Sequence, residues 1–249
     1  MATANPAMDV DIYRRVARSE SASTAMTLQG SAVKTGVLVV ILLIAAGFTW
    51  SQTMAGGAAA LSYGLLIAGS IGGLITAFVT VFFPRVSPIT APIYAALEGL
   101  VLGAISAIFE ARYRGIAIQA VSLSVGVLTV MLLVYATGII RATQKVRIGI
   151  VAATGAICLI YVADFVLAMF GVNVPYIHES SPIGIGFSLV VVVIAALNLI
   201  LDFDFIEQGV SRQAPKYMEW YGGFSLLVTL VWMYLEILRL LAKIKDNRG

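Results

Sequence analysis

Charged side chains are scarce in this chain, and so are the residues from which most enzymes build active sites. Only 12% of its 249 residues are Asp, Glu, Lys or Arg, whereas soluble domains contain about 25%. One cysteine, Cys158, cannot form an internal disulfide, and its apolar surroundings are typical of a small buried hydrophobe. One histidine, His178, falls in a polar loop, where a surface side chain is expected rather than a metal ligand. Metalloprotease, serine-hydrolase and P-loop motifs are absent. These absences argue against a soluble globule and against an enzyme.

Long apolar runs dominate what is present. Hydrophobic residues make up 60% of the chain, and the mean hydropathy is +0.96. A spanning helix needs about 20 such residues, and backbone groups in lipid must be satisfied internally, so these runs are predicted to be helices. Seven segments qualify: 34–51, 60–83, 89–110, 116–140, 148–170, 183–206 and 217–242. The predicted fold is therefore an all-α integral membrane protein with seven transmembrane helices.

The distribution of charge along the chain suggests two regions and an orientation. Residues 1–32 are polar and are expected to form a flexible cytoplasmic tail, while residues 33–249 form the transmembrane domain. With the N-terminus inside, ten of the 16 basic residues lie on the inner side, as the positive-inside rule requires. Four of the other six lie at the C-terminal end, so the side of the C-terminus stays open.

Acidic residues lie within or at the ends of the apolar segments. They are Glu98, Asp164, Asp202, Asp204 and Glu236. A carboxylate in hydrocarbon costs roughly 2.5–3.5 kcal/mol even on insertion scales, so such groups typically line a polar interior. No lysine or arginine lies deep in any segment to pair with them all. This pattern is typical of a membrane protein that handles cations or protons.

The end of the sixth segment contains the densest polar group. Asp202 and Asp204 are two residues apart, which separates them by about 200° on a helix, so they cannot face one cavity. Either Asp202 faces the interior together with Asn198, or Asp204 does; alternatively, both acids sit in headgroup water beyond the helix end. If the last two segments form a tight hairpin, Ser225 and Thr229 reach a similar depth. Such oxygen ligands are suited to a hard cation.

The remaining acids carry weaker signals. Glu98 is expected to be a protonatable interior group, with a hydrogen-bonded structural role as the alternative. Asp164 lies nearer the outer interface, where it is able to reach water. Glu236 precedes Arg239 by three residues, a spacing that favours a local ion pair and a structural role.

Four stretches of sequence resemble the Bax inhibitor-1-like family, most closely its bacterial branch with a long polar N-terminus. They are Phe82–Pro88, Glu98–Gly103, Phe203-Asp204 and Leu235–Leu241. The resemblance implies a seven-helix bundle in which the last helix is central and is wrapped by the first six. It also implies a pH-sensitive calcium leak, governed by one aspartate late in helix six and another in helix seven, with an arginine that latches the first.

The same resemblance assigns these roles to particular residues. Asp204 matches the helix-six aspartate, with Asp202 as the alternative, and Arg85 matches the latch arginine. The resemblance thus implies transient binding of Ca²⁺ by Asp204 and Asp202. The helix-seven aspartate is replaced by Thr229, so the resemblance leaves a second acid to be supplied by Glu98, Asp202 or Glu236, or implies a different pH response.

We therefore expect a pH-sensitive calcium leak channel in a bacterial cytoplasmic membrane, with the N-terminus cytoplasmic. The alternatives are a non-transporting binding protein that modulates a membrane protease or another membrane partner, and a proton-coupled small-solute transporter that needs Glu98. We expect a monomer in contact with lipid, with calcium as the permeant ion, no cofactor and no nucleic acid. The residues expected to sense ions or pH are Asp204, Asp202, Arg85, Glu98, Thr229 and Asn198, with Asp164 and Glu236 as weaker candidates.

Overall fold

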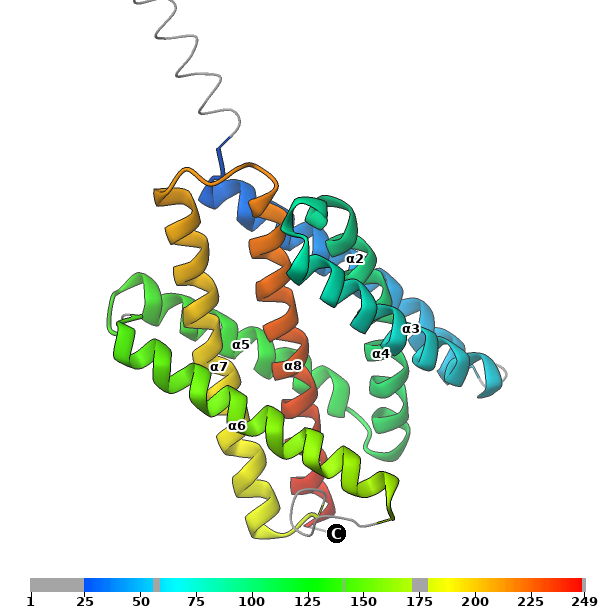
Figure 1. Cartoon of the computed structure of the whole chain (residues 1–249). Coiled ribbons are helices and arrows are strands. Elements are labelled where there is room, and N and C mark those ends of the chain that lie inside the picture. Colours follow the sequence, from blue (N-terminus) through cyan, green and yellow to red (C-terminus); the bar gives the residue numbers. More distant parts are fainter. Residues whose placement is uncertain (1–24, 56–58, 141, 172–178, 248–249) are drawn as a thin grey trace, which may run out of the picture.

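Seven long helices make up nearly all of the part of the chain that the structure describes (Figure 1). This computed structural model describes residues 25–55, 59–140, 142–171 and 179–247, without the side chains of residues 59–62. The helices are α2 (Leu28–Met54), α3 (Ala59–Phe82), α4 (Ser87–Arg112), α5 (Ile116–Ala136), α6 (Gln144–Met169), α7 (Pro182–Ser211) and α8 (Met218–Asp246), with a short 3₁₀ turn, η2 (Pro84–Val86), before α4. All seven are long and apolar enough to cross a membrane, which confirms the predicted fold class.

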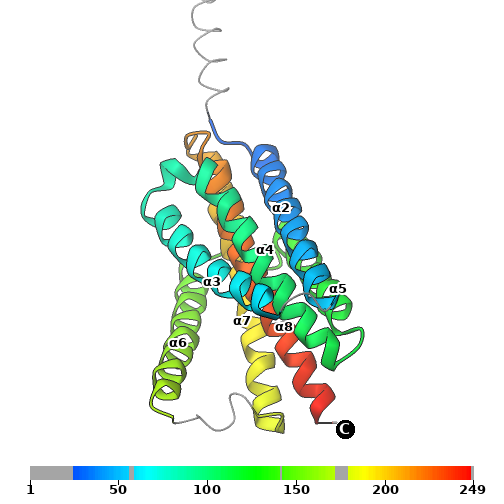
Figure 2. The same cartoon turned by 90° about the vertical axis from the view of Figure 1, so that its right-hand side faces the viewer.

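The last helix, α8, occupies the centre of the bundle (Figures 1 and 2). It packs directly against α2, α4, α5 and α7. Within its apolar stretch 56% of the residues are buried, against 11% in α6, which packs mainly on α7. The central position of α8 is therefore as the resemblance implies. Helices α3 and α6 form an outer layer, in which α3 packs on α4 and α6 packs on α7.

Two glycines of α4 allow the closest helix contact in the bundle. A Cβ atom on Gly99 would lie 2.4 Å from the carbonyl oxygen of Leu42, and one on Gly103 would lie 2.2 Å from that of Ala46. Only glycine permits such an approach of two backbones. The Gly99–Gly103 spacing thus places α4 directly against α2.

The residues immediately before α2 are fastened to the α7–α8 loop. Ala25 forms an isolated bridge with Pro215, and the Met26 N–H donates to the Ala214 carbonyl at 2.7 Å. Helix α2 begins at Leu28, so it starts inside the stretch that the sequence assigned to the tail. The rest of that tail, residues 1–24, lies outside the described residues.

A buried acid completes this attachment. Glu219, in the first turn of α8, is fully buried and accepts hydrogen bonds from the backbone N–H and the hydroxyl of Thr27, at 3.0 and 2.9 Å. Lys216 pairs with it at 3.1 Å. The start of α2 is therefore linked by charge-assisted hydrogen bonds to the start of the central helix.

Candidate functional site

Asp202 is the acid that α7 presents to the central helix. It is 7% exposed, and its Oδ1 accepts a hydrogen bond from the Ser225 hydroxyl at 2.6 Å. The hydroxyl of Thr229, one turn further along α8, adjoins the same carboxyl. Among the described residues, the buried Oδ2 of Asp202 has no hydrogen-bond partner. The structure thus places Ser225 and Thr229 at the depth of Asp202, as the sequence predicts for a tight hairpin of the last two helices.

Asp204 points away from this group, toward α6. Its Oδ2 lies 2.5 Å from a guanidinium nitrogen of Arg147 and accepts from the Gln208 amide at 2.6 Å. The two aspartates therefore face different neighbours, as their spacing on a helix requires. The cation paired with Asp204 is Arg147 rather than Arg85, the residue assigned as the latch by resemblance.

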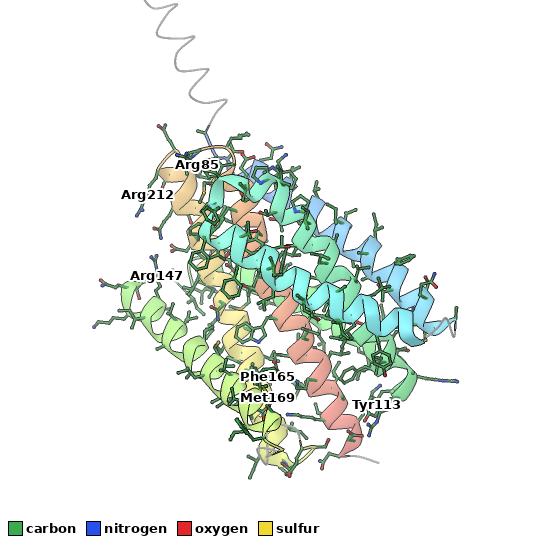
Figure 3. All side chains as sticks on the ribbon, turned by 45° about the vertical axis from the view of Figure 1, so that its right-hand side comes forward. Arg85, Tyr113, Arg147, Phe165, Met169 and Arg212 are labelled. Atoms are coloured by element: carbon green, nitrogen blue, oxygen red, sulfur yellow. The ribbon has the colours of Figure 1, made fainter. Side chains whose placement is uncertain are left out.

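The position of Arg85 explains this difference. Arg85 is exposed in η2, on the connection between α3 and α4. Arg147 lies in the first turn of α6, which packs alongside α7. Figure 3 shows Arg85 and Arg212 at one end of the bundle, Tyr113 toward the other, and Arg147 between these levels at the start of α6.

Asn198 does not join Asp202, although it lies one helical turn away. Its amide donates to the Thr154 hydroxyl of α6 and to the Ile194 carbonyl of its own helix, both at 2.8 Å. These bonds tie α7 to α6. In this conformation the side chain is a structural link rather than part of the acid site.

Glu98 lies on α4, where it adjoins α3. A Cβ atom on Gly73 would lie 3.0 Å from its Oε1, and Tyr94, one turn earlier, forms a side-chain hydrogen bond with it. Glu98 is half-buried, so it belongs to the bundle interior rather than to the lipid face.

The register between α4 and α8 sets the depth of Glu98. Both helices start at the same end, where the Ser87 hydroxyl donates to the Tyr217 carbonyl at 3.0 Å. Further along, the rings of Tyr94 and Phe224 meet edge to face at 5.0 Å. Glu98 lies one helical turn, about 6 Å, beyond Tyr94 on α4. The same distance beyond Phe224 on α8 reaches the level of Ser225 and Thr229, which adjoin Asp202. Two acids therefore lie at a similar depth in the bundle.

Two further acids lie toward the opposite end of the bundle. Glu236 is 2% exposed, and its Oε1 accepts from Arg239 at 3.0 Å and from the Tyr161 hydroxyl at 2.8 Å. The pair with Arg239 is the one that the spacing predicts. Asp164, half-buried on α6 one turn beyond Tyr161, is engaged in an interaction of its own.

Sequence reasoning missed two buried charges. Glu219 looks like an ordinary acid in the first turn of a helix, where the macrodipole favours negative charge, and nothing in its neighbourhood in the sequence predicts burial. Lys243 is 4% exposed and donates to the Gly184 carbonyl at 3.1 Å and to the Ser188 hydroxyl at 2.8 Å. Its position seven residues after Glu236, on the same helical face, is the only signal that sequence offered.

The Asp202 group offers one carboxylate and two hydroxyls, which are oxygen ligands suited to a hard cation. In the part of the chain that the structure describes, no group of three or more His, Cys, Asp or Glu side chains is arranged to hold a metal ion. Such a sparse oxygen set suits brief binding of a cation in transit better than a resident metal.

Comparison with known protein families gives a match over nearly the whole chain. The model of a family described as Bax inhibitor 1 like matches residues 5–246, nearly the whole chain. No curated protein and no solved structure matches significantly.

Proposed function

Because this chain belongs to the Bax inhibitor 1 like family of multi-pass membrane proteins, we propose that it is a pH-sensitive calcium leak protein of the bacterial cytoplasmic membrane. Calcium passes down its gradient beside the central helix, and Asp202 is the acid that attracts it. The N-terminus faces the cytoplasm, because most basic residues then lie on the inner side.

One observation supports this function most directly. Asp202 is a buried carboxyl in an apolar helix, and one of its oxygens has no partner among the described residues. Buried polar atoms are nearly always satisfied in native structures, and exceptions call for an explanation such as an absent water or ion. A permeant cation or a proton supplies that explanation.

The proposed pH response depends on the acids that lie at the depth of Asp202 in the bundle. Protonation of Asp202 removes its charge and weakens its attraction for calcium. Thr229 cannot supply a second carboxylate, so Glu98, at a similar depth on α4, is the acid that we assign as its counterpart. The ion pair between Asp204 and Arg147 ties α7 to α6, and we propose that its opening frees the end of α7.

Calcium flux into proteoliposomes tests this function. Wild-type protein is expected to give flux that changes between acidic and mildly alkaline pH. Asp202→Asn keeps the shape and removes the charge, and it is expected to lower the flux about tenfold, equivalent to about 1.4 kcal/mol. Glu207→Gln is the matched control, because Glu207 lies on the same helix but is exposed and bonded to Tyr135.

The outcomes separate the rival functions. Flux at the level of empty liposomes, at every pH, would overturn the leak and favour the non-transporting binding protein. Flux that requires an imposed proton gradient and is lost in Glu98→Gln would favour proton-coupled transport.

A further inference from the structure

The outer half of α8 contains a buried carboxyl, that of Glu236, with one oxygen that lacks a hydrogen-bond partner. Among the described residues, Asp202 and Glu219 share this feature. The side chain of Glu236 is 3% exposed, and its Oε1 accepts from both Tyr161 and Arg239. Its Oε2 is buried without a hydrogen-bond partner among the described residues. The environment of Glu236 thus resembles that of Asp202, with one carboxyl oxygen held and the other unpaired.

A row of widely spaced polar side chains runs along the interface of α7 and α8, separated by buried apolar residues such as Leu199 and Met233. Thr229, Glu236 and Lys243 are spaced by seven residues on α8, which keeps them on one face of the helix and about 10 Å apart. On α7, Ser188 and Asp202 flank the buried Ala195 at the same spacing, and Ser188 accepts the hydrogen bond of Lys243. The contacts of Asp202 with α8 and of Ser188 with Lys243 lie toward the two ends of this row.

Arg239 lies between Glu236 and the outside of the bundle. Its Nη1 donates to Glu236 at 3.0 Å and to the Tyr161 hydroxyl at 2.9 Å, and its guanidinium lies 5.3 Å from the centre of the Tyr161 ring. Arg239 also lines a cavity of about 300 Å³, together with Lys243, Asp246, Arg112, Tyr113 and Ser180. The Arg239 guanidinium therefore lies at the wall of this open cavity, whereas the Glu236 carboxyl is enclosed by protein.

We propose that Glu236 is a second station for the permeant cation and that Arg239 occupies it here as a tethered competitor. The inference rests on the proposed function. The side chain of Arg239 is 37% exposed and has the cavity to move into, whereas Glu236 cannot leave the interior. When the guanidinium swings out, both carboxyl oxygens of Glu236 are left for calcium, which binds carboxylates through one or both oxygens.

The charges around Glu236 set the strength of this competition. Arg239 and Lys243 on α8 are the cations of this region, and Asp164 on α6 is a second acid near Tyr161. A purely structural ion pair adds little net stability, because the desolvation of both charges offsets their attraction.

Two substitutions with opposite expected effects test the competition. Arg239→Gln removes the tethered cation and is expected to raise both calcium flux and Tb³⁺ affinity about tenfold, since a tethered group acts at a high effective concentration. Glu236→Gln removes the station and is expected to lower both. Arg112→Gln is the matched control, because Arg112 lines the same cavity but pairs with Asp246 at 3.1 Å.

Tb³⁺ luminescence of the purified protein gives a reading that does not depend on flux. Equal Tb³⁺ affinity and equal flux in wild type, Arg239→Gln and Glu236→Gln would overturn the second station, even if Asp202→Asn lowered the flux as proposed. Wild-type protein without calcium flux, but with Tb³⁺ binding altered by Arg239→Gln, would instead overturn the leak and keep the cation site.

A third variant keeps the proposal testable if Arg239→Gln does not fold. Tyr161→Phe keeps the ring and removes one donor to Glu236 and one acceptor of Arg239, so the ion pair persists in a weakened form. It is expected to raise Tb³⁺ affinity in the same direction as Arg239→Gln, by a smaller factor. If Arg239→Gln fails to yield folded protein, an unchanged affinity in Tyr161→Phe overturns the proposal.

Discussion

The hydrogen bond between Ser225 and Asp202 holds the most consequential side chain of the bundle. Ser225→Ala would leave the buried Asp202 carboxyl without its donor, and an unsatisfied buried acceptor costs about 1–3 kcal/mol. We expect the free energy of unfolding, measured by SDS titration from mild detergent micelles, to fall by about 1 kcal/mol, since hydrogen bonds in membrane proteins average less than in water.

Ser124→Ala is the control for this measurement. The Ser124 hydroxyl is buried and bonds only to the Ala120 carbonyl of its own helix, at 2.8 Å. Alanine favours the helix slightly, so the expected change is under about 0.5 kcal/mol. Equal losses in the two variants would contradict a special role for the Asp202 contact.

At the scale of residues, sequence predicted the directions of the two aspartates better than it predicted their partners. The opposed directions of Asp202 and Asp204 followed from helical geometry, and the Glu236–Arg239 pair followed from its spacing. The pairing of Asp204 with Arg147 did not, because it depends on where α6 lies against α7. Burial of Glu219 depends on residues almost 200 positions away, and no local pattern encodes such a contact.

At the scale of elements, the contact between α2 and α4 depends on atoms that glycine lacks. Gly103→Ala would place a Cβ atom 2.2 Å from the Ala46 carbonyl oxygen, a backbone atom that cannot turn aside. The helices would have to separate, and we expect a loss of about 1–3 kcal/mol in the free energy of unfolding, the usual cost of overpacking.

Gly36→Ala serves as the matched control, because a Cβ atom at Gly36 on α2 meets nothing within 4 Å. Alanine exceeds glycine in helix propensity by up to about 1 kcal/mol, so this variant is expected to be unchanged or slightly more stable. A loss in Gly36→Ala as large as that in Gly103→Ala would contradict the packing explanation.

The helices themselves could be predicted because their signal is local. Each apolar run is long enough to span a membrane, and each boundary carries turn residues such as Gly115 or Pro215. The exact ends of the helices could not be predicted in this way. Helix α7 continues to Ser211 and α8 to Asp246, through polar residues that tertiary contacts hold in helical form. The polar composition of residues 1–32 also gave no sign that Met26 is buried and holds the start of α2 against the α7–α8 loop.

At the scale of the whole molecule, the basic C-terminal end seemed to conflict with an odd number of spans. Three of the four basic side chains at this end make contacts within the protein. Lys243 is buried against α7, Arg239 pairs with Glu236, and Lys245 donates to the Arg114 carbonyl at 3.2 Å. Arg248, the fourth, lies outside the described residues. The orientation with the N-terminus inside stays a prediction from the basic residues of the loops.

Seven spans with the N-terminus inside place the α7–α8 loop in the cytoplasm and the α4–α5 loop outside. After Cys158→Ser removes the native thiol, Arg114→Cys is expected to react with a membrane-impermeant maleimide in intact cells. Arg212→Cys is expected to react only after the membrane is permeabilised. Both side chains are exposed, so accessibility within the protein does not limit labelling. The opposite pattern would invert the molecule, and the cavity beside Arg239 would then open to the cytoplasm, at the wrong end of the proposed calcium path to act as its outer station.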